Sequence, residues 1–138
     1  MVFQGLFQER HPVVIKQLKS IPDNEQDQKN FAREAHISHV ASSALLKSGH
    51  QANLVRFYGA CASPPHWCLV YENMPEGSAK KVLLDENKYK SDQPYDVSVI
   101  LQMALDVARG LSYLHSKKIV HRDVACRNLL IFDEKRLW

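Results

Sequence analysis

The first part of the chain alternates hydrophobic and polar residues with the short period of β-strands. Residues 3–7 and 12–18 form two such runs, and the consecutive β-branched residues at 13–15 suit a pleated, half-buried surface. A turn-rich acidic segment then leads into a helix predicted over residues 27–46, one face of which is only weakly apolar. Gly49 is placed to end that helix, because glycine readily adopts the left-handed conformation that follows helix ends.

Two more strands are predicted in the middle of the chain. They span residues 54–58, closed by Gly59, and residues 67–71. The proline pair at 64–65 forces a turn between them, because proline fixes φ and cannot donate a backbone hydrogen bond. Residues 72–78 then have the composition of a linker.

The most regular hydrophobic pattern lies in the C-terminal half. After a polar loop at 85–94, apolar residues recur at helical spacing and predict a helix over residues 96–115. Asp96 can cap this helix by accepting hydrogen bonds from amides two or three residues later. A short strand at 129–131 and the start of another at 136–138 follow. Strands in one half and helices in the other indicate an α+β fold.

The change of pattern near Asn73 also predicts two lobes. Segregated strands and helices are typical of separately packed parts of an α+β protein. The expected domains are therefore residues 1–73 and residues 74–138.

Composition narrows the range of functions. The 138 residues suffice for one ordinary domain, and a net charge of +3 is too small to favour nucleic acid as a partner. No uncharged run is long enough to cross a membrane, and no secretory leader is expected. Cys61, Cys68 and Cys126 fit no zinc motif and are interpreted as reduced thiols of a cytoplasmic protein. His36 and His39 lack a third ligand at a useful spacing, which favours surface histidines over a metal site.

Candidate chemistry is concentrated between the last predicted helix and the final hairpin. Asp123 could act as a general base, since a carboxylate within hydrogen-bond reach can accept a hydroxyl proton. Asn128 offers an amide oxygen, a ligand that Mg²⁺ accepts, and Arg122 could pair with an anion. Each residue alone carries little information, but His-Arg-Asp followed by Asn at this spacing is a specific signal.

The stretch at 121–128, His-Arg-Asp-Val-Ala-Cys-Arg-Asn, resembles the catalytic loop of a protein kinase, with Val124 in place of the usual leucine. The resemblance implies that Asp123 is the catalytic base and that Arg122 belongs to the same catalytic group. It also implies that Asn128 is a magnesium ligand in a reaction that uses ATP.

Two residues of this loop resemble the tyrosine-kinase branch of the family. Ala125 and Arg127 stand where many tyrosine kinases have a small residue and an arginine, an arrangement that leaves room for a tyrosine ring. The implied reaction is transfer of the γ-phosphate of ATP to tyrosine hydroxyls of protein substrates, with Arg127 in the catalytic group.

The resemblance extends to the second strand and the first helix. Residues 13–16, Val-Val-Ile-Lys, look like the strand whose lysine contacts the α- and β-phosphates of ATP, here Lys16. Glu34 is the implied partner that holds this lysine. Val14 replaces the usual alanine and would crowd the adenine, and Ser38 stands where the family prefers an apolar residue one turn after the glutamate.

Residues 69–78 resemble the hinge between the two lobes of a kinase. The match implies that the backbones of Glu72 and Met74 hydrogen-bond adenine, and that Tyr71 narrows the back of the nucleotide pocket. Leu130 would pack beneath the adenine ring.

The resemblance starts after the glycine-rich loop and stops before Asp-Phe-Gly; neither motif occurs in the 138 residues. The expected protein is thus a truncated, kinase-like two-lobed fold that is inactive as an isolated chain. In the family, later helices bury the apolar stripe of the helix at 96–115, so association through this stripe is expected. The alternative interpretation is a non-catalytic kinase-like module that binds other proteins.

Overall fold

A computed structural model describes residues 1–43, 53–83, 96–133 and 136–137. The chain divides into two compact units. The first consists of Met1–His50 and Val55–Asn73, and the second of Gln51–Leu54 and Met74–Trp138. The predicted helix end at Gly49 and the predicted loop at 85–94 lie outside the described residues.

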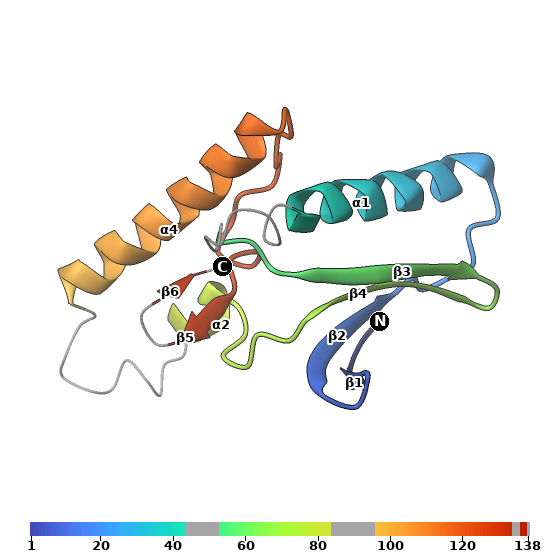
Figure 1. Cartoon of the computed structure of the whole chain (residues 1–138), viewed down its shortest axis with the longest axis horizontal. Helices are drawn as coiled ribbons and strands as arrows, with labels where there is room; N and C mark the ends of the chain where they lie inside the picture. Colours follow the sequence, from blue (N-terminus) through green and yellow to red (C-terminus); the bar gives the residue numbers. More distant parts are fainter. Residues whose placement is uncertain (44–52, 84–95, 134–135, 138) are drawn as a thin grey trace. The chain divides into compact units, whose positions relative to one another are not determined.

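The first unit is a four-stranded antiparallel sheet with one helix across a face (Figure 1). Its elements are β1 (Val2–Phe7), β2 (His11–Gln17), α1 (Glu25–Ser43), β3 (Phe57–Ser63) and β4 (His66–Glu72). The strand order is β1-β2-β4-β3, so β2 and β4 are central. Val13 on β2 and Leu69 on β4 are buried, as expected for apolar residues of central strands.

The strand predicted at 54–58 is displaced, because β3 begins at Phe57 and continues through Gly59 to Ser63. The register against β4 shifts between Phe57 and Gly59, which marks a β-bulge. Glycine inside a strand often accompanies a bulge, since it has no side chain to pack. Gly59 therefore lies within the strand instead of ending it. The predicted turn at 64–65 is confirmed and joins β3 to β4.

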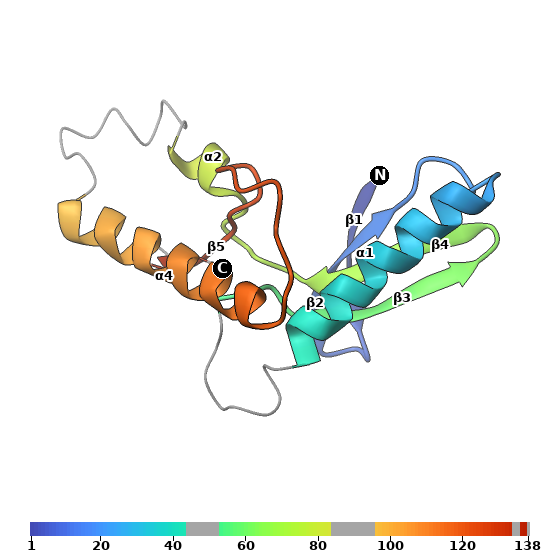
Figure 2. The same cartoon turned by 90° about the horizontal axis from the view of Figure 1, so that it is seen from above.

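Helix α1 runs across one face of this sheet, as the view from above shows (Figure 2). Phe31 is its buried apolar residue among those described, and the Phe31 ring meets the Trp67 ring edge-on at 5.0 Å between centroids. One aromatic contact cannot by itself hold a 19-residue helix, so polar contacts described below also attach α1 to the sheet.

The second unit contains α2 (Ala79–Leu83), α4 (Val97–Ser116), β5 (Ile131–Asp133) and β6 (Arg136–Leu137). Ala79, Met103 and Ile131 are buried together and form its core, with half-buried apolar neighbours packed around them. Asp96 caps α4 as predicted, because its carboxylate accepts a hydrogen bond from the Ser98 amide at 3.0 Å. Together the two units confirm the α+β class.

Helix α4 has one buried side and one exposed apolar side. Its exposed large hydrophobic residues are Val97, Ile100, Leu101 and Leu105. By length and composition alone α4 could cross a membrane, which is weak evidence because core helices of soluble proteins pass the same test. Asp106 is buried in the middle of the helix, where it pairs with Arg109 and accepts from Gln102.

Candidate active site

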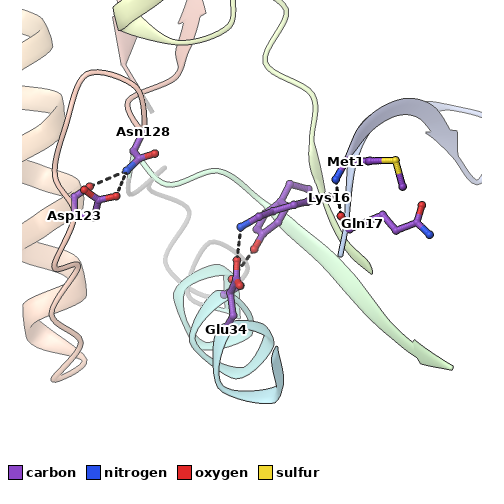
Figure 3. Close-up of polar contacts among 8 residues, drawn as sticks. Met1, Lys16, Gln17, Glu34, Asp123 and Asn128 are labelled. Carbon is purple, nitrogen blue, oxygen red and sulfur yellow. Dashed lines mark hydrogen bonds and ion pairs between the residues drawn. The ribbon is translucent and has the colours of Figure 1, made fainter. Parts of the chain in front are cut away.

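Lys16 and Glu34 form an ion pair in the first unit, between β2 and α1 (Figure 3). The Lys16 Nζ atom donates to Glu34 Oε1 at 2.7 Å. The two side chains are 53% and 42% exposed, so solvent screens the pair and its contribution to stability is small. Its main consequence is geometric, because it fixes where the ammonium group is held.

The other nucleotide-site residues predicted in this unit share the Lys16 face of the sheet. Val14 lies two residues before Lys16 and faces Tyr71 in the β2–β4 register, while Lys16 faces Leu69. Alternate residues of a strand project from the same face, so Val14, Lys16 and Tyr71 point to the side that α1 covers. The aliphatic Val14 is half-buried there.

Tyr71 is linked to α1 by a contact that the sequence did not reveal. The Ser38 and Tyr71 hydroxyl groups are hydrogen-bonded at 3.0 Å, and the Phe57 ring lies 5.2 Å from the Tyr71 ring. Burial raises the pKa of Tyr71, the bond with Ser38 opposes this, and the Glu34 charge adds to it. The phenol therefore stays neutral at physiological pH and can keep this hydrogen bond.

Three polar residues at four-residue intervals, Glu34, Ser38 and Ser42, form what we call the polar seam of α1. Each bonds to a different strand: Glu34 to Lys16 of β2, Ser38 to Tyr71 of β4, and Ser42 to β3. Residues four apart lie on the same helix face, so the seam is the sheet-facing side of α1. The weakly apolar face in the sequence thus corresponds to docking by hydrogen bonds.

Replacement of Ser42 by Ala should lower the free energy of unfolding of the first unit by about 1–3 kcal/mol. Ser42 is buried and its hydroxyl accepts from the Phe57 amide at 2.7 Å, so the change leaves a backbone donor unsatisfied. Ser43→Ala is the matched control, because the Ser43 hydroxyl donates to the Val40 carbonyl within the same helix. Urea titrations followed by tryptophan fluorescence would measure both; equal effects would contradict the seam.

The predicted hinge residues lie where β4 ends. The Glu72 amide donates to the Arg56 carbonyl at 2.9 Å, and the Met74 carbonyl accepts from the Gly77 amide at 3.1 Å. Met74 is buried. These two backbone groups are therefore committed inside the chain, and contacts of this segment with adenine stay a prediction.

The catalytic-loop residues lie in the second unit, between α4 and β5. The Asn128 amide group donates to the Asp123 carboxylate at 2.8 Å and to the Asp123 carbonyl at 2.9 Å (Figure 3). Arg127 Nη2 donates to the other carboxylate oxygen of Asp123. The Asp123 amide donates to His121 Nδ1 at 3.3 Å. Asp123 is thus held from three sides by residues at most five positions away.

These contacts set the charge of Asp123. The hydrogen bond from Asn128, followed by that from Arg127, holds the pKa of Asp123 below its usual range. The carboxylate is therefore ionised at neutral pH and acts as a hydrogen-bond acceptor. Such a group can align a substrate hydroxyl and accept its proton as the hydroxyl reacts.

The two arginines of the loop differ in their surroundings. Arg127 forms the ion pair with Asp123 described above. Arg122 has a left-handed backbone, with φ of 66°, and none of the ion pairs in the described part of the chain includes it. This conformation is uncommon for a residue other than glycine, and such conformations cluster at functional loops.

Asn128 has the chemistry expected of a magnesium ligand. Its amide nitrogen is engaged by Asp123, which leaves the side-chain oxygen as the atom that would face a cation. Among the described residues there is no group of three His, Cys, Asp or Glu side chains that could hold a metal ion by itself. One protein oxygen supplemented by phosphate oxygens is a usual arrangement for Mg²⁺ in phosphate sites.

The backbones of Leu130 and Ser78 pair in an isolated antiparallel β-bridge. The neighbours of Leu130, Leu129 and Ile131, pack in the core of the second unit. Leu130 itself is half-buried. Its predicted contact with the adenine ring stays a prediction. The structure thus brings together Lys16, Glu34, Val14 and Tyr71 in one unit. It brings together Asp123, Arg127 and Asn128 in the other.

Comparisons of the sequence with known proteins identify the family of this chain. A family model described as protein tyrosine and serine/threonine kinase matches residues 1–137. Serine/threonine/tyrosine-protein kinase HT1 of Arabidopsis thaliana is 34% identical, over 99% of this chain and 33% of the relative. Serine/threonine-protein kinase STY46 of the same plant is 36% identical, over 89% of this chain and 19% of the relative. Tyrosine-protein kinase Abl of Drosophila melanogaster is 32% identical, over 86% of this chain and 6% of the relative.

The chain therefore spans a third or less of the length of these relatives. The family model nevertheless covers nearly all of it, through both units and all the motifs discussed above. The chain belongs to the protein tyrosine and serine/threonine kinase family.

Proposed function

We propose that these residues form the N-terminal lobe and catalytic loop of an ATP-dependent kinase that phosphorylates tyrosine residues of proteins. Membership of the family supports a phosphotransferase. The observation that carries the proposal is the Lys16–Glu34 ion pair, formed across 18 positions of the sequence. An ammonium group fixed in this way neutralises phosphate charge as a compact point charge.

The catalytic loop supplies the acceptor side of the reaction in this proposal. The ionised Asp123 carboxylate accepts a hydrogen bond from the substrate hydroxyl and takes up its proton as the phosphoryl group is transferred. Arg127 and the Asn128 amide hold this carboxylate in place. Magnesium, bound in part by the Asn128 oxygen, would neutralise charge on the phosphates.

The preference for tyrosine rests on two residues. Ala125 is half-buried and small, and Arg127 is turned onto Asp123, which supports an open position for a phenol ring beside the carboxylate. The relatives include kinases named for serine/threonine, for tyrosine and for all three. Activity on tyrosine peptides over serine peptides, measured in a completed kinase domain, tests this part, and the reverse preference would contradict it.

ATP with Mg²⁺ should raise the melting temperature of the 138-residue chain, because a ligand that binds the folded state stabilises it. Lys16→Met should weaken ATP binding by about 10–100-fold, the range for losing a hydrogen bond to a charged group of about 1.5–3 kcal/mol. Lys19→Met is the matched control, since Lys19 is exposed just beyond β2. Thermal-shift titrations give both affinities.

Absence of any ATP-dependent shift would contradict a nucleotide site in this chain. Equal affinities of the Lys16 and Lys19 variants would instead leave nucleotide binding intact but remove Lys16 from it. The same titration with Mg²⁺ alone separates nucleotide binding from a general effect of the cation.

The 138 residues alone are proposed to lack useful turnover, since they contain neither Gly-x-Gly-x-x-Gly nor Asp-Phe-Gly. Loss of one preorganised electrostatic group costs about 10²–10³ in rate. The glycine-rich loop and the aspartate of Asp-Phe-Gly are two such groups. A phosphotransfer assay with radiolabelled ATP would overturn this proposal if it detected Mg²⁺-dependent product that Asp123→Asn abolishes.

A second candidate function is a non-catalytic module that associates through α4. The observation in its favour is the row of exposed residues Val97, Ile100, Leu101 and Leu105, which are 45–68% exposed. Apolar surface of this kind favours association with another protein surface. Defined heterocomplexes without any ATP-dependent stabilisation would favour this function. In both cases we propose a cytoplasmic location, in keeping with three free cysteines.

A further inference from the structure

Two of the three cysteines face each other across adjacent strands. Cys61 of β3 is the register partner of Cys68 of β4, between the pairs Ala60↔Leu69 and Ala62↔Trp67. The two strands lie side by side and are joined by a tight turn (Figure 1). Both thiols are free and half-buried, whereas Cys126 lies in the other unit.

The backbone pattern shows what kind of pair this is. The Leu18 amide donates to the Trp67 carbonyl, so Gln17 and Cys68 form a non-hydrogen-bonded pair between β2 and β4. The N–H and C=O groups of Cys68 then point toward β3, which makes Cys61↔Cys68 a hydrogen-bonded pair. Such pairs have Cα atoms about 5.5 Å apart, within the range that a disulfide spans.

The two thiols also project from the same face of the sheet. Trp67 and Tyr71 contact Phe31 and Ser38 of α1, so these alternate residues define the face that the helix covers. Cys68 lies between them in the alternation and points to the opposite face, and directly opposed residues share a face. The pair is therefore outside the helix–sheet interface. Burial, then the neighbouring Cys61, raises the pKa of Cys68.

We propose that Cys61 and Cys68 form a redox-active dithiol that a low-molecular-weight disulfide, such as glutathione disulfide, converts into a cross-strand disulfide. One protein thiolate attacks a sulfur of glutathione disulfide, and one glutathione leaves and takes up the proton. The second protein thiol then attacks the mixed disulfide and displaces the second glutathione. Two thiols and one disulfide become one protein disulfide and two glutathione thiols, so glutathione disulfide receives the two electrons.

The position of the bond suggests its consequence. Cys68 also faces Gln17 of β2, the residue after Lys16. A covalent link between β3 and β4 would thus stiffen the strand that neighbours Lys16, without any change in register. The thiols project away from α1, so formation of the bond does not require the polar seam to open.

The test uses the whole 138-residue chain, folded, in glutathione buffers of increasing oxidised fraction. Each sample is quenched with acid, alkylated and mapped by mass spectrometry. The expected product is a chain lighter by two hydrogen atoms, in which one peptide pair joins Cys61 to Cys68 and Cys126 is alkylated. Stable glutathione adducts without the internal bond, or links to Cys126, would overturn the proposal.

Variants provide the controls. Cys126→Ser should form the bond at the same oxidised fraction as the unchanged chain. Cys61→Ser and Cys68→Ser should each accumulate the mixed disulfide, because the resolving thiol is missing. The unchanged chain in urea should need a higher oxidised fraction of glutathione to form the Cys61–Cys68 link, because strand pairing no longer holds the two thiols together. Formation of the link at the same oxidised fraction in urea would show that proximity along the sequence, instead of strand pairing, causes it. None of these results depends on kinase activity.

Discussion

Replacement of Asp123 by Asn is expected to reduce phosphoryl transfer by about 10²–10⁴-fold, the usual contribution of a positioned general base. The assay requires a complete kinase domain. One can be made by inserting residues 1–137 into one of the relatives, in place of the segment that they match. Asn keeps the shape of the side chain but removes the charge that accepts the hydroxyl proton. ATP affinity should stay within about threefold, because the role proposed for Asp123 concerns the acceptor hydroxyl and not the nucleotide.

The contacts of Asp123 give this prediction a second readout. Hydrogen bonds from Asn128 and Arg127 lower the pKa of Asp123, so the group stays ionised where a free aspartate, with a pKa near 3.9, begins to protonate. Because its pKa is lowered, Asp123 stays a charged base at a more acidic pH than a free aspartate does. Protonation of Asp123 should therefore limit the rate only at a more acidic pH than it would for an unpaired aspartate, and Arg127→Ala should move that limit upward.

The control variant is Asp23→Asn, a change of the same kind at an exposed residue outside the loop. It should leave the rate unchanged. If the Asp23 and Asp123 variants lost activity equally, the loss would come from charge or folding, and Asp123 would have no role as the base. An Asp123 variant with full activity would remove this loop from the reaction.

The parts of the site that could be predicted from the sequence are those made by neighbours in the chain. Asp123 contacts Arg127 and Asn128, four and five residues later, so spacing within one loop largely determines the geometry. The Asp96 cap was predictable for the same reason. Lys16 and Glu34 are 18 positions apart, and only the resemblance to kinases paired them.

Contacts between distant elements could not be predicted. Ser38 and Tyr71 are 33 positions apart, and a serine on a helix gives no indication of which strand it will meet. The weak apolar face of α1 was recognised, but its cause was not, because hydrogen bonding to the sheet leaves no hydrophobic period. The predicted end of this strand at residue 58 is wrong because glycine commonly terminates strands, whereas here the register shift places Gly59 beside a bulge and β3 continues to Ser63.

Leu69→Ala is expected to be the most destabilising single change in the first unit, at about 2–5 kcal/mol. Leu69 is 1% exposed on the central strand β4, opposite Lys16 on one side and Ala60 on the other. Alanine would leave a cavity that the two flanking strands cannot close without losing their ladders. Leu69→Met, which nearly conserves volume, should cost less than about 1.5 kcal/mol.

The matched control is Leu6→Ala on the edge strand β1, where the leucine is 66% exposed. This substitution should change stability by no more than about 0.5 kcal/mol. Urea unfolding followed by tryptophan fluorescence in a Trp138→Phe background reports on the first unit, because the remaining Trp67 packs against Phe31. Equal effects of the Leu69 and Leu6 variants would show that this face is not the core.

The Leu69 variant also tests how the sheet supports the proposed nucleotide site. On the face that α1 covers, Leu69 lies between Trp67 and Tyr71, the two β4 residues that contact the helix. A cavity there should loosen both contacts, and through the polar seam the Lys16–Glu34 pair. Under conditions where the variant is still folded, its affinity for ATP should therefore fall while Leu6→Ala retains full affinity. Unchanged ATP affinity in a folded Leu69→Ala chain would mean that the ion pair is positioned independently of how α1 packs on the sheet.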